Sequence, residues 1–137
     1  MQTFLPMIGF EESAKVLDYR RLGKQRIECW QILNVLRGQT KAWQNHPAVK
    51  MWRGYEQALI EYALNICEEW LQRGYKDTMY ERFLTLEKMD LLVYPSWFGN
   101  CSFHSAHRAA LLAKDYEWYS QFHWSEIPEI KYYWPVK

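Results

Sequence analysis

Glycine, proline and cysteine are sparse in this sequence of 137 residues, with 6, 5 and 3 copies. So few glycines and prolines exclude collagen-like repeats, Pro-rich linkers and extended disorder. The cysteines lie far apart and form no C-x-x-C pair, which excludes a disulfide framework and favours reduced thiols. No apolar run approaches the ~20 residues of a membrane span, and no signal-peptide pattern is present. We therefore expect a cytoplasmic protein with no membrane partner.

Charge of one sign is also lacking, because 17 Lys and Arg residues face 16 Asp and Glu residues for a net charge of +1. A general attraction to nucleic acid is therefore not expected, and any basic site must be local. Aromatic residues, in contrast, are abundant and make up 18% of the chain, including 8 Trp and 10 Tyr. Such an excess of rings builds a dense core or lines a pocket for a flat ligand.

Helical periodicity dominates the sequence. From residue 48 to 73 apolar residues recur every three or four positions, which predicts one long amphipathic helix. A second helix is predicted to begin after Asp18, its N-cap, and to end at Gly38. Gly23 inside this second helix costs about 1 kcal/mol relative to alanine, which indicates a close approach by another group.

Shorter helices are predicted over residues 77–88 and 102–114, joined by a turn-rich aromatic loop. The tail IPEIKYYWPVK is predicted to lie extended across the helices. The sequence has neither alternating strand patterns nor internal repeats. We therefore predict an all-α fold, in which residues 1–137 form one compact helical domain with an extended aromatic C-terminal tail.

Residues 17–28, LDYRRLGKQRIE, concentrate basic side chains in an otherwise neutral chain. Arg21, Lys24 and Glu28 share one face of the predicted helix. A guanidinium, an ammonium and a carboxylate side by side suit a phosphate-bearing ligand, with the acid left to handle a proton. The alternative is a solvated face on which Lys24 and Glu28 form an ordinary ion pair. The candidate phosphate ligands from this segment are Arg20, Arg21, Lys24 and Gln25.

Residues 43–56, WQNHPAVKMWRGYE, combine polar and aromatic side chains at the start of the predicted long helix. Free backbone N–H groups at such a position attract anions, and nearby rings can stack on a base. The alternative is that His46 caps the helix and Trp52 belongs to the core. The candidate binding residues here are Asn45, His46, Trp52 and Tyr55, with Trp43 as a further ring.

Residues 103–115, FHSAHRAALLAKD, place two histidines and an arginine on one helix face. Two histidines at this spacing can bind zinc, but no third ligand accompanies them, and no motif indicates a cofactor. We therefore expect neither metal nor cofactor. The face suits phosphate binding or proton transfer, or alternatively packing and capping. We predict that it lies across one pocket from the basic face of residues 17–28, with Trp43 or Trp52 as a wall. The candidates are His104, His107, Arg108 and Lys114.

Five segments together carry a family resemblance: MQTFLP, LDYRRLGKQRIE, NHPAVKMWRGYEQAL, EEWLQRGY and FHSAHRAALLAKDYEWY. They resemble the pyrimidine-dimer DNA glycosylase, or endonuclease V, family of T-even phages, and most of all its small bacterial and phage branch. The likeness spans nearly the whole chain.

The resemblance implies an all-α fold and a reaction in which an N-terminal α-amine attacks the sugar C1′. A Schiff base forms, the base leaves, and β-elimination cuts the strand with the help of a glutamate. An α-amine suits this task because a pKa near ~8 leaves a useful neutral fraction. Met1 would supply the amine, since Gln2 is too large for the usual removal of the initiator Met. Where the family has its glutamate this sequence has Arg21, and Glu28 is the nearby acid on the same helix face.

Two functions stay open at this point. One is a DNA glycosylase with lyase activity, in which Met1 is the nucleophile and Glu28 or His107 is the acid/base. The other is a non-catalytic protein that captures a free nucleotide in the same pocket. A third and weaker alternative is an adaptor whose aromatic surface binds another protein.

Overall fold

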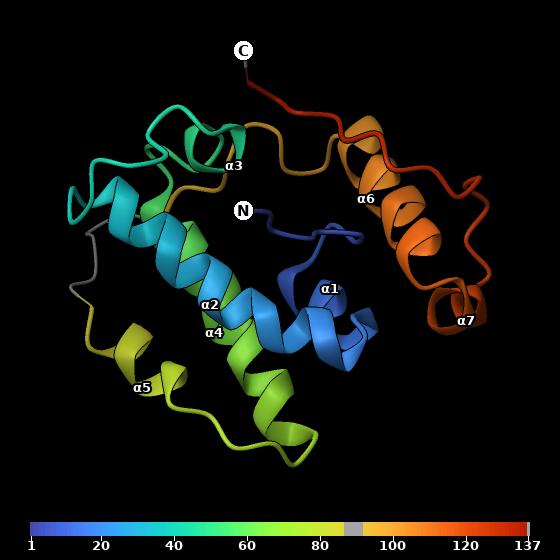
Figure 1. The fold of residues 1–137 in the computed structure, drawn as a ribbon, viewed down its shortest axis with the longest axis horizontal. Helices are drawn as coiled ribbons and strands as arrows, with labels where there is room; N and C mark the ends of the chain where they lie inside the picture. Colours follow the sequence, from blue (N-terminus) through green and yellow to red (C-terminus); the bar gives the residue numbers. More distant parts are fainter. Residues whose placement is uncertain (87–91, 137) are drawn as a thin grey trace.

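The computed structural model describes residues 1–86 and 92–136, which Figure 1 shows as an assembly of helices. In chain order these are α1 (Phe10–Val16), α2 (Tyr19–Leu36), α3 (Pro47–Lys50), α4 (Glu56–Gln72), α5 (Met79–Leu84), α6 (Cys101–Lys114) and α7 (Tyr116–Tyr119). A 3-10 helix over Ser120–Phe122 follows α7 directly. No β-strand occurs among the described residues, and the predicted all-α fold is confirmed.

Helix α2 begins as the sequence predicts, because the Asp18 carboxylate accepts a hydrogen bond from the Arg21 N–H at 3.4 Å. One face of α2 is buried against α4. The close approach predicted at Gly23 is made by the indole of Trp70 on α4, since a Cβ on Gly23 would lie 2.9 Å from two ring carbons. The missing side chain therefore lets two helices pack closely.

The prediction of one continuous helix over residues 48–73 is wrong. Helix α3 ends at Lys50, the chain turns, and α4 begins at Glu56. Gly54 lies in this turn with φ of 86°, a left-handed conformation that suits glycine. Met51 and Trp52 are nevertheless buried, so the apolar periodicity continues through the turn and hides the interruption.

Helix α6 matches its prediction closely and is capped by Asn100, whose side chain accepts a hydrogen bond from the Phe103 N–H at 3.1 Å. Helix α5 is shorter than predicted, and residues 87–88 of that prediction lie outside the described residues. Helices α1 and α7 were not predicted from the sequence, because helices of 7 and 4 residues hold too few turns to show a period.

Helices α2 and α4 pack on each other at the centre of the fold, and α1 and α5 both contact α4. Helices α6 and α7 form a separate group on the other side of the N-terminal segment, residues 1–6 (Figure 1). Residues 3–6 are buried, so the N-terminal segment runs through the interior between the two groups. In the described part of the chain no helix is long and apolar enough to cross a membrane.

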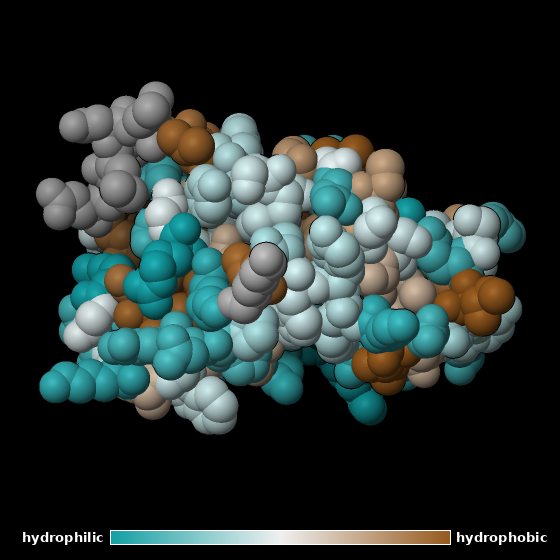
Figure 2. Space-filling view, turned by 90° about the horizontal axis from the view of Figure 1, so that it is seen from above, coloured by the Kyte–Doolittle hydropathy of each residue, from teal (hydrophilic) through white to brown (hydrophobic). Residues whose placement is uncertain are grey.

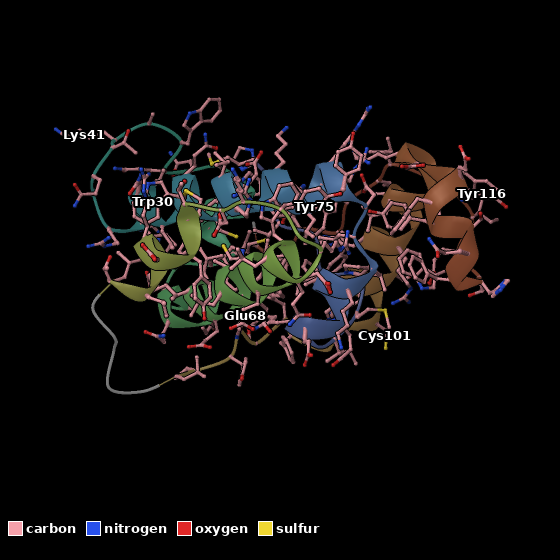
Figure 3. All side chains as sticks on the ribbon, turned by 90° about the horizontal axis from the view of Figure 1, so that it is seen from below. Trp30, Lys41, Glu68, Tyr75, Cys101 and Tyr116 are labelled. Atoms are coloured by element: carbon pink, nitrogen blue, oxygen red, sulfur yellow. The ribbon has the colours of Figure 1, made fainter. Side chains whose placement is uncertain are left out.

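The C-terminal tail, residues 124–136, has no regular secondary structure. Tyr132 and Trp134 pack against the core, while Ile127 is 82% exposed. Figure 2 views the face that carries this tail, and brown apolar groups appear there as separate patches between teal and pale ones. From the opposite side, Figure 3 shows Lys41, before α3, and Tyr116, at the start of α7, at opposite ends of the molecule.

Candidate functional site

Side chains from α2 and α4 hold the backbone of the N-terminal segment. The Phe4 N–H donates to Gln25 Oε1 at 2.9 Å, and Gln25 Nε2 donates to the Gln2 carbonyl at 2.9 Å. The Tyr62 hydroxyl lies within hydrogen-bond distance of both the Phe4 carbonyl and Gln25 Oε1, which share its single proton. Because an extended segment cannot satisfy its own backbone groups, these buried partners fix its path.

Two histidines of α6 hold the same segment from the other side by binding both backbone polar groups of Leu5. The Leu5 N–H donates to His107 Nδ1 at 2.9 Å, and His104 Nδ1 lies 2.8 Å from the Leu5 carbonyl. His104 Nε2 accepts from the Gly99 N–H at 3.0 Å, so its Nδ1 carries the proton. Both rings are therefore neutral. Burial and the neighbouring His104 lower the pKa of His107 to about 3.

Arg108 completes the hold on the N-terminal segment. Its guanidinium donates to the Pro6 carbonyl at 2.8 Å and forms a two-bond pair with Glu126, at 3.0 and 2.9 Å. This pairing with Arg108 lowers the pKa of Glu126, which also accepts from Ser105 at 2.9 Å. Arg108 thus connects the N-terminal segment, α6 and the tail through charge-assisted hydrogen bonds.

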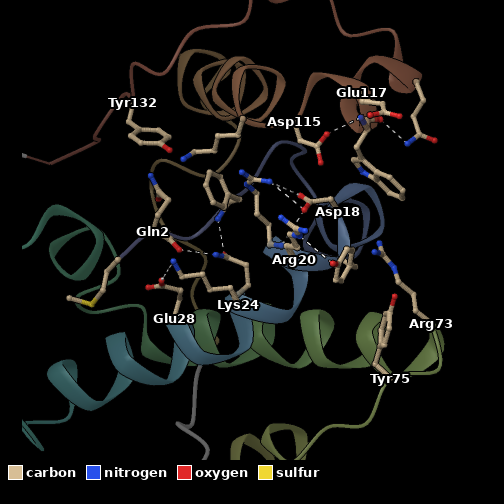
Figure 4. Close-up of a pocket in the computed structure, with 18 residues that line it drawn as sticks. Gln2, Asp18, Arg20, Lys24, Glu28, Arg73, Tyr75, Asp115, Glu117 and Tyr132 are labelled. Atoms are coloured by element: carbon tan, nitrogen blue, oxygen red, sulfur yellow. Dashed lines mark hydrogen bonds and ion pairs between the residues drawn. The ribbon is translucent and has the colours of Figure 1, made fainter.

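A cavity of about 1220 Å³, called the large cavity below, opens where the N-terminal segment, α2, the end of α4 and the α6–α7 region meet. Figure 4 shows labelled side chains entering it from α2 and, on the opposite wall, Tyr132 of the tail. Both charge signs are present. The basic lining residues are Arg20, Arg21, Lys24, Arg73 and Lys114, and the acidic ones are Asp18, Glu28, Asp115 and Glu117.

The basic side chains of the large cavity differ in how firmly they are held. Arg21 Nη1 lies 3.3 Å from Asp18 Oδ1, and Asp18 also accepts a short hydrogen bond from the Tyr119 hydroxyl, so this pair is fixed. Lys24 lies 3.7 Å from Glu28 and its side chain is 74% exposed. Arg20 is exposed and lies over the Tyr19 ring. Exposed cations of this kind can turn toward a phosphate at little cost.

Met1 and Glu28 line both the large cavity and a second one of about 400 Å³, called the small cavity below. The Glu28 Oε2 atom is buried and has no hydrogen-bond partner in the part of the chain that the structure describes. Burial and the positive α-amine of Met1 lower the pKa of His46, and Glu28 opposes them. The Met1 amine and the Glu28 carboxylate thus act on the His46 imidazole in opposite directions. A carboxylate oxygen without a partner, on a residue that lines the same cavities as Met1, is suited to proton transfer.

The structure brings half of the sequence-predicted site residues to the large cavity and the rest elsewhere. On the cavity are Met1, Arg20, Arg21, Lys24, Gln25, Glu28 and Lys114. Away from it are Asn45, His46, Trp52, Tyr55, His104, His107 and Arg108.

The prediction that the polar face of α6 lies across one pocket from the basic face of α2 is wrong. The N-terminal segment lies between the two helices, and its backbone forms hydrogen bonds with the polar side chains of α6. Trp52 is buried in the core, where its indole N–H donates to Thr3 at 3.0 Å. His46 caps α3 by accepting from the Ala48 N–H at 3.1 Å. Asn45 is exposed in the preceding loop, and Tyr55 precedes α4.

Several residues of the large cavity were not predicted from the sequence. Arg73 and Tyr75 belong to the segment EEWLQRGY, which carries part of the family resemblance but has no pattern that marks its side chains as a site. Gln2 and Tyr132 reach the cavity only through the path of the N-terminal segment and of the tail. No local pattern indicates where irregular segments run, so these two had no signal in the sequence.

Comparison with known families identifies the chain. The family model of the pyrimidine dimer DNA glycosylases matches residues 1–81, more than half of the 137 residues, and the chain belongs to this family. Neither curated proteins nor solved structures gave a match. The matched part contains Met1, Glu28 and Arg73 of the large cavity, whereas α6, α7 and the tail follow it. Membership indicates a DNA-repair function of the glycosylase type.

Proposed function

We propose that this protein is a DNA glycosylase with AP lyase activity on a damaged or modified base. The Met1 α-amine is the nucleophile, and Glu28 is the general acid and base. The observation that carries the proposal is that Met1 and Glu28 share the wall of a cavity whose rim presents exposed cations. The firm hold on residues 2–6 supports it further, because a nucleophile must be kept in one position to react efficiently.

The reaction proceeds in two stages. In the first, the neutral amine forms a bond to C1′ while the C1′–N bond breaks, and the base leaves with the bonding electrons and takes up a proton. The sugar ring then opens at the C1′–O4′ bond, O4′ is protonated, and a protonated imine joins Met1 to the sugar. Glu28 moves these protons, because it has an unpaired oxygen and lines the same two cavities as Met1.

In the second stage Glu28 removes a proton from C2′ and the C3′–O3′ bond breaks. The 3′ phosphate leaves and the strand is cut. Water then hydrolyses the imine and restores the free amine. Arg20, Lys24 and Lys114 bind the phosphates that flank the sugar, since they line the same cavity.

Borohydride trapping tests the nucleophile. On a duplex with an abasic site, reduction of the imine should give a stable protein–DNA adduct, and peptide mapping should place it on Met1. Mapping is decisive because Lys24 and Lys114 are also amines in the cavity. Intact-mass measurement establishes that Met1 is the free N-terminus, and a Gly-Ser extension ahead of Met1 should abolish the adduct.

The role of Glu28 is tested with a matched pair of variants. Glu28→Gln should lower strand cleavage about 100-fold or more, since acid/base groups contribute roughly 10²–10⁴ in rate. Glu117→Gln, which changes another acid of the same cavity, should keep at least half of the activity. Equal losses in the two variants would contradict the assignment of Glu28.

A folded protein that forms no adduct would favour capture of a free nucleotide instead. The mixed charge of the large cavity is compatible with that second function. In a thermal-shift screen with mono-, di- and cyclic nucleotides, the class that binds would then raise the midpoint of thermal unfolding.

A further inference from the structure

The two cavities that meet at Met1 and Glu28 differ in the chemistry of their remaining walls. The large cavity has the basic side chains named above. The small cavity has no basic side chain among its described lining residues, which include two carboxamides, a hydroxyl, a valine and the indole of Trp43. The carboxamides belong to Gln31 and Asn34. Its volume of about 400 Å³ lies in the usual range for small-ligand pockets.

The order of these groups follows α2. Arg20 and Lys24 in its first half face the large cavity, Glu28 follows, and Gln31 and Asn34 line the small cavity beyond it. Figure 4 shows Arg20, Lys24 and Glu28 in this sequence along the helix. With a rise of 1.5 Å per residue, the two carboxamides lie roughly 5–9 Å further along the axis than Glu28.

A nucleotide has the same order of parts: phosphate, sugar, base. C1′ is the sugar atom that carries the base, so a nucleophile that attacks it must lie where a phosphate-binding and a base-binding surface meet. Met1 lies at that boundary. We therefore infer that the small cavity is the subsite for the nucleobase of the nucleotide that Met1 attacks, an inference that rests on the proposed function. Gln31 and Asn34 bind the hydrogen-bonding edge of the base, and Trp43 stacks on its face.

Trp43 has the properties of a stacking side chain. It is 66% exposed, although a large apolar ring of this kind is ordinarily buried. Its φ of 67° is in the left-handed region, which is strained for a bulky residue and persists where the surrounding structure holds it. His46 contacts the ring edge-on with centroids 6.0 Å apart, and supports it at the rim of the small cavity.

Binding to two duplexes tests the subsite directly. One contains a pyrimidine dimer, and the other contains a tetrahydrofuran abasic analogue, which has no base and does not react. By fluorescence anisotropy of the full chain, Trp43→Ala should weaken binding to the dimer duplex about tenfold, the loss of one stacked base. Trp43→Ala should bind the tetrahydrofuran duplex with an affinity within about twofold of the wild-type value, because this duplex has no base to stack.

Three further variants sharpen the result. Trp43→Phe keeps a ring and should restore most of the lost affinity. The double variant Gln31→Ala/Asn34→Ala should also weaken binding to the dimer duplex selectively. Tyr116→Ala removes an exposed ring at the end of the molecule far from the loop before α3 and should change neither affinity. Wild-type binding that does not distinguish the duplexes, or a Trp43→Ala effect that is absent or equal on both, would overturn the inference.

Failure of the subsite and failure of the proposed function give different results. Trapping on abasic DNA needs no base, so Trp43→Ala should form the adduct as readily as the wild type. If the wild type forms the adduct but Trp43→Ala binds the dimer duplex as tightly as the wild type, only the base subsite is overturned. A wild type that forms no adduct overturns the Met1 chemistry, whatever Trp43→Ala does to binding.

Discussion

Leu5 shows how single residues of α6 determine the position of the chain's first residue. Its backbone N–H and C=O each bind an imidazole nitrogen; His107 must be neutral to accept from the N–H, and His104 is neutral because its other nitrogen accepts from the Gly99 N–H. Protonation of His107 at Nδ1 would replace its acceptor with a donor and break the bond to Leu5. The hold on the N-terminal segment is therefore sensitive to acid.

This arrangement predicts a loss of stability as pH falls. The pKa of His107 drops from its ordinary value of 6.5 to about 3 in the folded chain, so between these values the unfolded state binds more protons. The free energy of unfolding should therefore decrease as pH is lowered from about 6.5 toward 3, by up to about 1.4 kcal/mol per pH unit for this residue. Denaturant titrations across this range measure the slope.

Two variants isolate the contribution of His107. His107→Gln should lower the free energy of unfolding by about 1–3 kcal/mol at pH 8 and should flatten the slope below pH 6.5, since the titrating group is gone. His123→Gln, at an exposed position after α7, should leave the slope as in the wild type. An unchanged slope in His107→Gln would contradict the assignment.

At the scale of the element, the contact between α2 and α4 at Gly23 predicts that alanine is less stable than glycine at this position, although helix propensity alone would favour alanine. The Trp70 ring that covers Gly23 is held by Arg26 at 4.4 Å from its centroid and by a bond from its N–H to the Lys76 carbonyl at 2.8 Å. Gly23→Ala should therefore destabilise the protein by about 1–3 kcal/mol, although alanine favours the helix by about 1 kcal/mol.

The test is a double-mutant cycle with Trp70→Leu. With the ring gone, Gly23→Ala should become neutral or stabilising, which gives a coupling energy of at least about 1 kcal/mol by denaturant titration. If Gly23→Ala instead stabilises the protein with Trp70 in place, contact with the Trp70 ring is not what requires glycine at this position.

The elements that the sequence predicted well are those with strong local signals. Helices α2 and α6 have polar caps at Asp18 and Asn100 and long periodic faces, and both were placed within a residue or two. The break between α3 and α4 was missed, because Trp52 is buried although it lies in a turn. The apolar periodicity of a sequence indicates which residues are buried, and in this turn the buried residues are not helical.

The candidate site was predictable where it lies on one helix. Arg21, Lys24 and Glu28, which helical spacing puts on one face, do line the same cavity. The polar face of α6 was a different case. His104 and His107 look equally suited to chemistry in the sequence, but they bind backbone atoms of the N-terminal segment instead. Such contacts between distant segments leave no local pattern.

At the scale of the whole molecule, the near-neutral charge predicts a modest salt dependence of DNA binding. Arg21 is paired with Asp18, which leaves Arg20, Lys24 and Lys114 as the exposed cations of the α2 and α6 walls. Three phosphate contacts give a slope of about −3 for log K against log salt concentration. Anisotropy titrations from 50 to about 200 mM salt measure it.

Single variants test which cations contribute. Lys114→Ala should reduce the magnitude of the slope by about 1 and weaken binding to all sequences alike. Arg82→Ala, on α5 and outside the large cavity, should leave the slope unchanged. A wild-type slope near −10, or an effect of Arg82→Ala as large as that of Lys114→Ala, would show that DNA binds a different surface.

The position of the N-terminal segment between α2 and α6 also determines when its contacts can form during protein synthesis. His107, which binds the Leu5 N–H, is 102 positions further along the chain. A chain growing from its N-terminus therefore cannot complete the hold on its first residues until α6 has been made and docked. A ribosome-bound fragment that already contains Met1 and Glu28 therefore lacks the two histidine contacts that fix Leu5 from the α6 side.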